Sequence, residues 1–327
     1  MSSITRRNFI AASAGAAMLG LSACGGSNSS SDSSSSSEDK TYKIGVLQLT
    51  QHAALDAANE GFVAALDEAG IKYEIDQQNA NNDQSACSTI ASKLVGDEDD
   101  LIYVIATPAA QAVLAATTEI PIVGSAITDY AASGLVADND APGGNLTGTS
   151  DMNPVDEQIE MLQKVCPDAK HIGMLYCTAE SNSQLQIEMA EAACDKAGLT
   201  YERFTVSSSN EVQSVVESMV GKVDAGYTPT DNTIAAAAAQ VGQICKEGKL
   251  PFVTGEENMC MGMGVCTLSI DYAELGKMAG EMAVKILTEG ADPATMAIET
   301  ESTDQLQTIK NEEMAEALGI DLSVLDA

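Results

Sequence analysis

Apolar residues along the chain follow two spacings in turn, and this alternation predicts strands and helices in regular succession. Short continuous apolar runs at 42–49 and 101–107 are typical of buried strands. Between them, Leu55, Phe62 and Leu66 recur at the spacing of one helix face. The same succession continues through the first half of the chain, which predicts a parallel sheet with helices on both faces.

A segment rich in Pro and Gly, residues 139–154, separates this half from a second one with the same kind of pattern. Strand-like runs occur at 170–177 and 200–206. Residues 231–248 predict one continuous helix, and residues 272–290 predict a long amphipathic helix. The chain is therefore predicted to be an α/β protein made of two halves of similar size and order.

The first residues of the chain are predicted to be an export signal rather than part of the fold. Arg6 and Arg7 precede a short apolar run that ends at Cys24, and the run is too short to span a membrane as a helix. We interpret residues 1–23 as a lipoprotein signal peptide, with Cys24 as the lipidated residue, and the arginine pair as a twin-arginine signal. Residues 24–40 are rich in serine and predict a flexible tether.

Charge and composition exclude several classes of function. The chain has 16 basic and 48 acidic residues and a formal net charge of −32, so nucleic acid is excluded as a partner. Arg203 is the only arginine after the signal, so an anionic ligand group would have to be bound by backbone N–H groups and hydroxyls. The chain contains no Trp and four Phe, which disfavours a carbohydrate ligand.

No pattern of metal ligation or catalysis is present in the sequence. His52 and His171 have no ligand-like spacing to cysteines, and no CxxC motif occurs. The seven cysteines after Cys24 are predicted to be buried free thiols, although Cys260 and Cys266 could pair. No arrangement of nucleophile and base is evident, so neither an enzyme nor a cofactor is predicted.

The turns that follow the predicted strands are the candidate ligand site, because open parallel sheets bind ligands beyond the carboxyl ends of their strands. Turns of the first half offer hydroxyls and amides, whereas those of the second offer Asp231, Glu256 and Glu257. This division predicts a zwitterionic ligand whose ammonium group lies on Asp231 or Glu256. Asp231 could instead serve only as a helix cap, together with Asn232, and one carboxylate can do both.

Several segments resemble the solute-binding lipoproteins of ABC transporters that are assigned to tryptophan, tyrosine and related ligands. The resemblance covers residues 41–307, and its most specific parts are "PTDNT" at 229–233, "GEE" at 255–257 and "SDMNPV" at 150–155. It implies the fold of type I periplasmic binding proteins, which is α/β with two Rossmann-like lobes, parallel sheets and a hinged cleft. It also implies three crossovers between the lobes, with lobe one at 41–147 plus 271–297 and lobe two at 148–270 plus 298–327.

The resemblance further implies a set of residues that face the cleft. These are Gln48, Thr107, Ser125, Ser150, Asn182, Thr230, Asp231 and Glu256. Tyr176, with Tyr130 and Tyr227, could add ring contacts to an aromatic ligand.

The function implied is that of a lipid-anchored receptor, expected to be a monomer, that delivers an aromatic amino acid to the permease of an ABC importer. It would be exported to the outer face of the cytoplasmic membrane, at the cell surface or in a periplasm. Two alternatives stay open. One is a receptor for another small solute, such as an aliphatic amino acid or a nucleoside. The other is a surface receptor or adhesin with the same fold and no role in transport.

Overall fold

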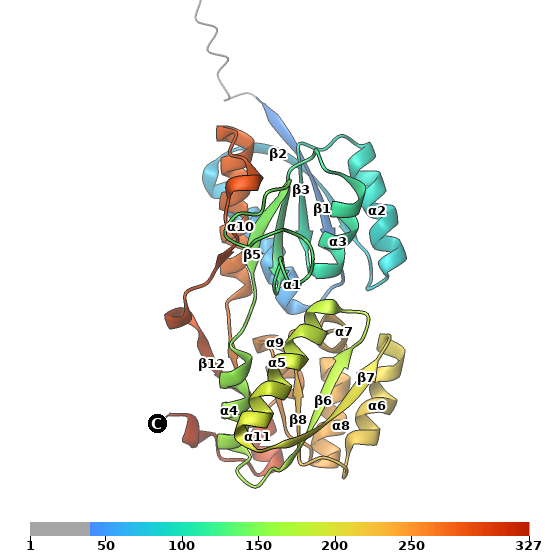
Figure 1. The fold of residues 1–327 in the computed structure, drawn as a ribbon, viewed down its shortest axis with the longest axis vertical. Coiled ribbons are helices and arrows are strands. Elements are labelled where there is room, and N and C mark those ends of the chain that lie inside the picture. Colours follow the sequence, from blue (N-terminus) through green and yellow to red (C-terminus); the bar gives the residue numbers. More distant parts are fainter. Residues whose placement is uncertain (1–39, 327) are drawn as a thin grey trace, which may run out of the picture. The chain divides into compact units, whose positions relative to one another are not determined.

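The computed structural model describes residues 40–326, which belong to one compact unit. Figure 1 shows that this unit consists of two α/β lobes, each built around its own sheet. The predicted signal peptide and Cys24 lie outside the described residues, as does the tether apart from Lys40. No helix of the described residues combines the length and apolarity that crossing a membrane requires.

The sheet of the first lobe has six parallel strands in the order β11-β5-β4-β3-β1-β2. Their bounds are β1 Thr41–Gln48, β2 Lys72–Asn79, β3 Leu101–Ile105, β4 Ile122–Ile127, β5 Leu146–Ser150 and β11 Glu299–Thr300. The order places the carboxyl ends of β1, β3 and β4 side by side, as predicted for a ligand-binding edge.

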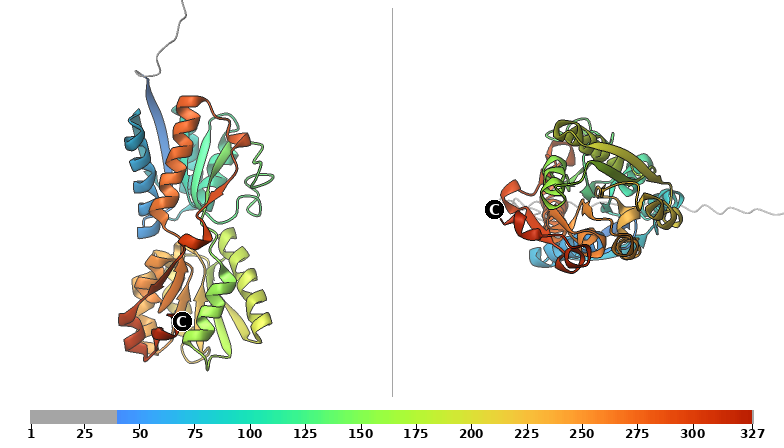
Figure 2. Two further views of the ribbon diagram at one scale, coloured as in Figure 1. Left: turned by 90° about the vertical axis from the view of Figure 1, so that its left-hand side faces the viewer. Right: turned by 90° about the horizontal axis from the view of Figure 1, so that it is seen from below.

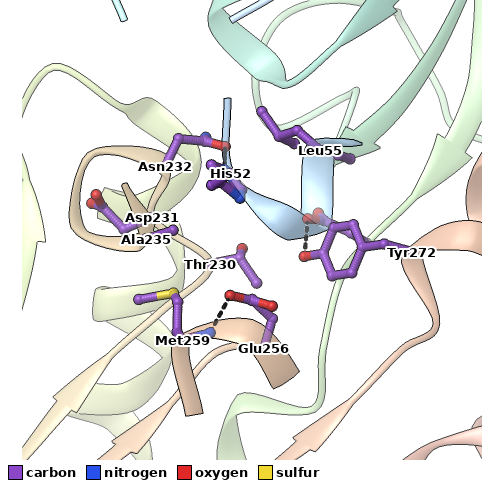
Figure 3. Close-up of a pocket in the computed structure, with 11 residues that line it drawn as sticks. His52, Leu55, Thr230, Asp231, Asn232, Ala235, Glu256, Met259 and Tyr272 are labelled. Carbon is purple, nitrogen blue, oxygen red and sulfur yellow. Dashed lines mark hydrogen bonds between the residues drawn. The ribbon is translucent and has the colours of Figure 1, made fainter. Parts of the chain in front are cut away.

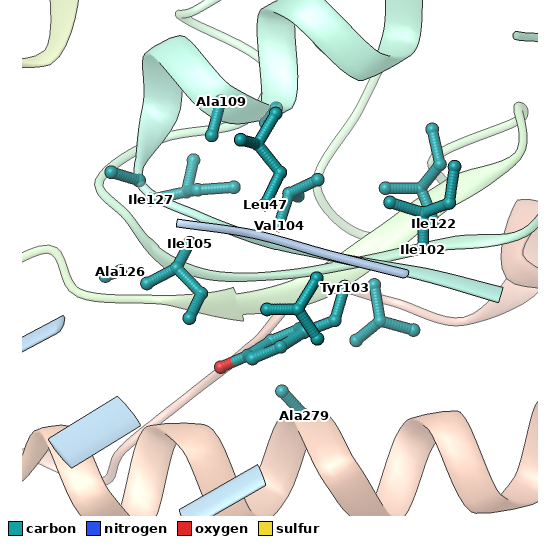
Figure 4. Close-up of a cluster of buried hydrophobic side chains, with 14 of the residues drawn as sticks. Leu47, Ile102, Tyr103, Val104, Ile105, Ala109, Ile122, Ala126, Ile127 and Ala279 are labelled. Atoms are coloured by element: carbon teal, nitrogen blue, oxygen red, sulfur yellow. The ribbon is translucent and has the colours of Figure 1, made fainter. Parts of the chain in front are cut away.

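Helices cover both faces of this sheet. Their bounds are α1 Ala53–Ala69, α2 Gln84–Gly96, α3 Thr107–Ala116 and α10 Tyr272–Val284. In β3, successive side chains alternate between the faces, so that Tyr103 lies on the side of Ala279 in α10 and Val104 lies on the side of Ala109 in α3 (Figure 4). Every residue of β3 is buried, which is typical of a central parallel strand.

α1 and α10 approach each other closely because glycines lie at their contact. A Cβ atom on Gly276 would come within 1.9 Å of the Ala58 carbonyl oxygen, and one on Gly61 within 2.0 Å of the Ala273 carbonyl oxygen. The contact joins a helix from the start of the chain to one that enters this lobe only after the whole second lobe.

The sheet of the second lobe has the order β12-β10-β9-β8-β6-β7 and is parallel except for the antiparallel edge strand β12. The strands are β6 His171–Cys177, β7 Thr200–Val206, β8 Ala225–Thr228, β9 Phe252–Thr254, β10 Cys266–Ser269 and β12 Gln307–Lys310. The helices are α4 Val155–Val165, α5 Ser181–Ala197, α6 Val212–Met219, α7 Asn232–Ala235, α8 Ala238–Gly248, α9 Glu257–Met263 and α11 Glu312–Leu318. Two apolar clusters, one on each face, form its core.

Three segments connect the lobes. The first view of Figure 2 shows the two lobes one above the other, with the chain crossing between them. They lie between β5 and α4, between β10 and α10, and between β11 and β12. The first and third crossovers differ by a few residues from the predicted boundaries at 147/148 and 297/298. The reason is that β5 continues in the first sheet to Ser150, and β11 joins that sheet at Glu299–Thr300.

Two further sequence predictions differ from the structure, and two helices of the structure were not predicted. Residues 231–248 are not one helix but α7 and α8, because Ala237 leaves the helical conformation at φ −105° and ψ 6°. The segment 139–154, predicted to be a linker, contains the strand β5. The helices α4 and α9 were not predicted at all.

The described cysteines after Cys24 are all free thiols, including Cys260 and Cys266. Six of the seven are buried, and Cys166 is partly buried. Burial also raises the pKa of the Cys87 and Cys177 thiols to about 11. These thiols therefore pack as small apolar groups.

Candidate functional site

A cavity with about 260 Å³ of space free of protein atoms lies where the two lobes meet (Figure 3). The first lobe contributes the start of α1 and the end of β4, and the second contributes the turns before α7 and α9. The first crossover contributes Asp151, and the start of α10 contributes Tyr272. The lining residues are His52, Leu55, Ala126, Asp151, Thr230, Asp231, Asn232, Ala235, Glu256, Met259 and Tyr272.

The cavity contains three carboxylates and no permanent cation among the described residues that line it. Burial raises the pKa of Glu256 to about 7. The pKa of Asp231 is raised by burial and by the negative charge of Glu180, and the pKa of Asp151 is raised by burial. Burial lowers the pKa of His52, which disfavours a counter-charge on its ring. A group with a positive charge is therefore what this cavity lacks.

Asp231 is the N-cap of α7, as the sequence predicted for its structural role. Its Oδ1 atom accepts from the backbone N–H of Ile234 at 2.9 Å, and its Oδ2 atom accepts from the backbone N–H of Cys177 at 2.6 Å. The carboxylate is turned toward the start of the helix in Figure 3. Both of its oxygens are thus bound by protein, and Asp231 is 1% exposed.

Glu256 caps α9 in the same manner. Its two carboxylate oxygens accept from the backbone N–H groups of Asn258 and Met259, both at 2.6 Å. The short helix α9 also brings the Met259 side chain to the cavity. Glu256 therefore both shapes the turn and supplies negative charge to the site.

Asp151 follows β5 at the start of the first crossover and differs from the other two acids. Its Oδ2 atom accepts from the Tyr272 hydroxyl at 2.8 Å, whereas its Oδ1 atom has no hydrogen-bond partner. The residue is 3% exposed. Asp151 and Tyr272 were not among the predicted site residues, although both lie in segments that carry the family resemblance, "SDMNPV" and "SIDY".

Hydrogen bonds join the lobes around the cavity. The His52 ring atom Nε2 lies 3.1 Å from Oδ1 of Asn232, and Nδ2 of Asn82 donates to Oγ1 of Thr233 at 2.9 Å. Glu180, which is 2% exposed, accepts four hydrogen bonds from backbone and side-chain donors of Asn232 and Thr233. The turn that meets the first lobe is thus held by Asp231 and Glu180 together.

Four of the predicted site residues line the cavity, namely Thr230, Asp231, Asn232 and Glu256. Asn182 and Gln48 support that lining. Nδ2 of Asn182 donates to the Thr230 carbonyl at 3.1 Å. The Gln48 amide donates to the Thr50 carbonyl at 2.8 Å and to Oδ1 of Asp56 at 2.6 Å.

The other predicted residues lie beside the cavity or away from it. Ser150 donates to the Thr128 carbonyl at 2.6 Å, and Ser125 hydrogen bonds to the Tyr103 hydroxyl within the first core. Thr107 begins α3 with its buried hydroxyl unpartnered. These positions are not among the residues that line the cavity, and their contact with a ligand stays a prediction.

The tyrosines predicted to give ring contacts are buried elsewhere. Tyr176 lies in β6, with its hydroxyl 3.4 Å from Nη1 of Arg203. Tyr227 donates to Gln158 at 2.8 Å, and Tyr130 donates to the Thr149 carbonyl at 3.1 Å. The aromatic rings that line the cavity are those of Tyr272 and His52, together with the apolar side chains of Leu55 and Met259.

Comparison with known proteins shows which proteins this chain is similar to. A family model described as ABC transporter substrate binding protein matches residues 43–324. A protein from Clostridioides difficile named tyrosine-binding protein is 39% identical over 314 residues, which cover 94% of this chain and 90% of that protein.

Two solved structures have nearly the same sequence identity to this chain but different TM-scores. One, from Streptococcus pneumonia and in complex with L-Trp, is 40% identical, with a TM-score of 0.84 over 88% of this chain and 98% of that chain. The other is a ligand-free, open substrate-binding protein with adhesive properties from Clostridium difficile. It is 41% identical, with a TM-score of 0.65 over 86% of this chain and 95% of that chain.

Proposed function

Because the chain belongs to the family of ABC transporter substrate-binding proteins, we propose that it binds an aromatic amino acid between its lobes and delivers it to an ABC permease. Tyrosine and tryptophan are the leading ligands, since one relative is named for tyrosine and a similar structure contains L-Trp. Solute binding, without chemical conversion of the ligand, is the activity that follows from this family.

The acidic character of the cavity is the observation that carries the proposal. Asp151, Asp231 and Glu256 face a space of about 260 Å³ that has no lining lysine or arginine. The ligand's ammonium group would compensate the buried negative charge, and its ring would pack against Leu55 and Met259.

The ligand's carboxylate is expected on the first-lobe side, away from the acids. Hydroxyl groups and backbone N–H groups of the turns after β3 and β4 would bind it, because those turns contain no acidic residue next to the cavity. Two residues at these strand ends, Ala106 and Ala126, have positive φ angles of 85° and 55°. Such strained conformations in non-glycine residues concentrate at functional sites.

Adhesion is the second candidate function. It is favoured by the similar protein from Clostridium difficile that is described as having adhesive properties.

We further propose that the protein is a monomer, exported by the twin-arginine route and anchored to the membrane through a lipid on Cys24. The export route and the lipid anchor rest on Arg6, Arg7 and the run that ends at Cys24. Cells supplied with a labelled fatty acid should label the wild-type protein and leave a Cys24→Ala variant unlabelled. Equal labelling of both would contradict the anchor.

A ligand screen tests the proposed function. The chain from residue 40 onward, which contains every described element, is melted with each of the twenty amino acids. A ligand at 100 times its dissociation constant adds about 2.7 kcal/mol to the free energy of unfolding, which raises the melting temperature by several degrees. We expect this rise with L-Tyr or L-Trp. No rise with any of the twenty would overturn the proposal.

A further inference from the structure

Asp151 lines the cavity and has one side-chain oxygen without a hydrogen-bond partner. Its Oδ1 atom is buried and accepts no hydrogen bond, although the residue is 3% exposed. A buried polar atom without a partner costs about 1–3 kcal/mol, and more when it carries charge. Such an atom in a ligand site is accounted for when the ligand supplies the missing donor.

The other two acids of the cavity have already used both oxygens. Asp231 accepts the N–H of Ile234 in the helix that it caps and the N–H of Cys177 at the end of β6, and Glu256 accepts two N–H groups of the helix that it caps. Their charge contributes to the field in the cavity, but their carboxylate oxygens are already bound by backbone groups of the second lobe. Asp151 does not cap the helix that follows it, since α4 begins only at Val155.

We infer that Asp151 binds the α-ammonium group of the amino acid through Oδ1, while the Tyr272 hydroxyl fixes the orientation of this carboxylate through Oδ2. The inference rests on the proposed function, because it assumes that the ligand is an amino acid. It names one residue for the ammonium group where the sequence had pointed to Asp231 or Glu256.

Asp151 also lies at the connections between the lobes. Asp151 lies on the first crossover and Tyr272 begins the helix after the second, so their hydrogen bond joins two of the three connections between the lobes. The backbone N–H of Asp271 donates to Glu301 at 2.9 Å, which joins the second crossover to the third. A ligand on Asp151 is therefore attached to the hinge itself, and its charge acts where the lobes move.

The groups that face Asp151 favour an incoming cation. Tyr272 and, to a smaller extent, the Thr128 hydroxyl stabilise its charged form, but burial outweighs them and raises its pKa. The nearby Tyr130 and Glu256 add no positive charge. An ammonium group would restore the ordinary ionisation of Asp151, so binding to this residue releases protons in proportion to its protonated fraction.

Asp151→Asn is the variant that tests the inference, because it keeps the shape of the side chain and removes its charge. The probes are L-Tyr and L-Trp, each with its counterpart that lacks the amino group, 3-(4-hydroxyphenyl)propanoate and indole-3-propanoate. Calorimetry should show that the wild type prefers the amino acids. The variant should bind them about 30-fold or more weakly, and its preference over the counterparts should largely disappear.

Asp99→Asn is a matched control. Asp99 is also a buried acid with an unpartnered oxygen and a pKa raised by burial, but it lies before β3, at the opposite end of the strand from the cavity. Both substitutions remove an uncompensated buried charge, so both should leave the melting temperature of the ligand-free protein equal or higher. Only the change at Asp151 should alter binding.

Tyr272→Phe keeps the inference testable if the asparagine variant does not fold. This variant should bind the amino acids about tenfold more weakly and bind the counterparts with unchanged affinity, because only the amino acids contact Asp151. Equal weakening of both probe classes would assign Tyr272 a purely structural role and overturn the inference.

The outcomes separate this inference from the proposed function. If the wild type binds L-Tyr or L-Trp and Asp151→Asn binds it within threefold, with the same preference, the inference is wrong and the proposed function stands. If the wild type binds none of the twenty amino acids, the proposed function fails and the inference fails with it.

Discussion

Glu256 is a buried acid in a cavity without a permanent cation, so its protonation is linked to folding. Its pKa rises from the ordinary 4.5 to about 7 in the folded protein. Between these values the unfolded state releases the proton and the folded state keeps it. The free energy of unfolding of the ligand-free protein therefore loses this contribution as the pH rises from about 4.5 to about 7.

Replacing Glu256 by Gln removes this titration and gives a prediction for pH dependence. The free energy of unfolding of E256Q relative to the wild type should increase between pH 5 and 7, by at most ~3 kcal/mol, and stay constant above pH 8. Urea unfolding of both proteins at each pH measures it. The lowered pKa of His52 makes the free energy of unfolding rise with pH, which is opposite to the effect of Glu256. Because His52 is present in both proteins, its contribution cancels in the difference between them. A difference that does not vary with pH would contradict the assignment.

The candidate site was predictable where its residues carry a local signal. Asp231 precedes an alanine-rich helix, and the preference of Asp for the N-cap is visible from a few neighbouring residues. Asp151 carries no such signal. Its partner Tyr272 is 121 residues away along the chain, and only the folded crossovers bring the two together.

At the scale of elements, long segments of regular spacing were predictable and short ones were not. The strand β7 lies where the pattern placed it, and the helix α10 begins at the predicted residue, Tyr272. The strand β5 was missed because the Gly and Thr residues of "LTGTS" read as part of a loop, and only pairing with β4 and β11 makes it a strand. Tertiary pairing determined this element, and local propensity did not.

The break between α7 and α8 shows the same limit in a helix. Five consecutive alanines at 235–239 favour an uninterrupted helix. The structure nevertheless ends α7 after one turn and breaks the run at Ala237. The bonds that fix the start of α7 come from Glu180 and Asp231, and those to the first lobe from His52 and Asn82, so none of these partners can be read from the alanine-rich segment itself.

At the scale of the whole molecule, the structure is more similar to that of a ligand complex than to that of an open, ligand-free protein. Two proteins of nearly equal identity to this chain, 40% and 41%, give TM-scores of 0.84 for the L-Trp complex and 0.65 for the open, ligand-free form. Similar sequences of the same fold differ this much when their lobes are arranged differently. The bonds between lobes described above belong to the arrangement of the lobes in this structure, and each one should shift the balance between this arrangement and a more open one.

Two bonds outside the cavity allow this shift to be tested without touching the ligand site. Nε2 of Gln84 donates to the Ala179 carbonyl at 2.9 Å, and Nε2 of Gln111 donates to Oγ of Ser181 at 3.4 Å. Each joins the first lobe to the second, and neither residue lines the cavity. The double variant Gln84→Ala, Gln111→Ala should weaken binding of L-Tyr or L-Trp about 3- to 10-fold, because a closed state that has lost two hydrogen bonds is less populated.

Small-angle scattering and stopped-flow kinetics distinguish this effect from damage to the fold. Ligand should reduce the radius of gyration of both proteins, and the loss of affinity in the variant should come mainly from faster dissociation. Gln243→Ala is the control, since Gln243 bonds only to Glu247 within α8 and should leave the affinity unchanged. If the double variant binds as tightly as the wild type, these bonds contribute nothing to closure. Closure would then depend on the ligand and on the contacts of His52 and Asn82 with the turn before α7.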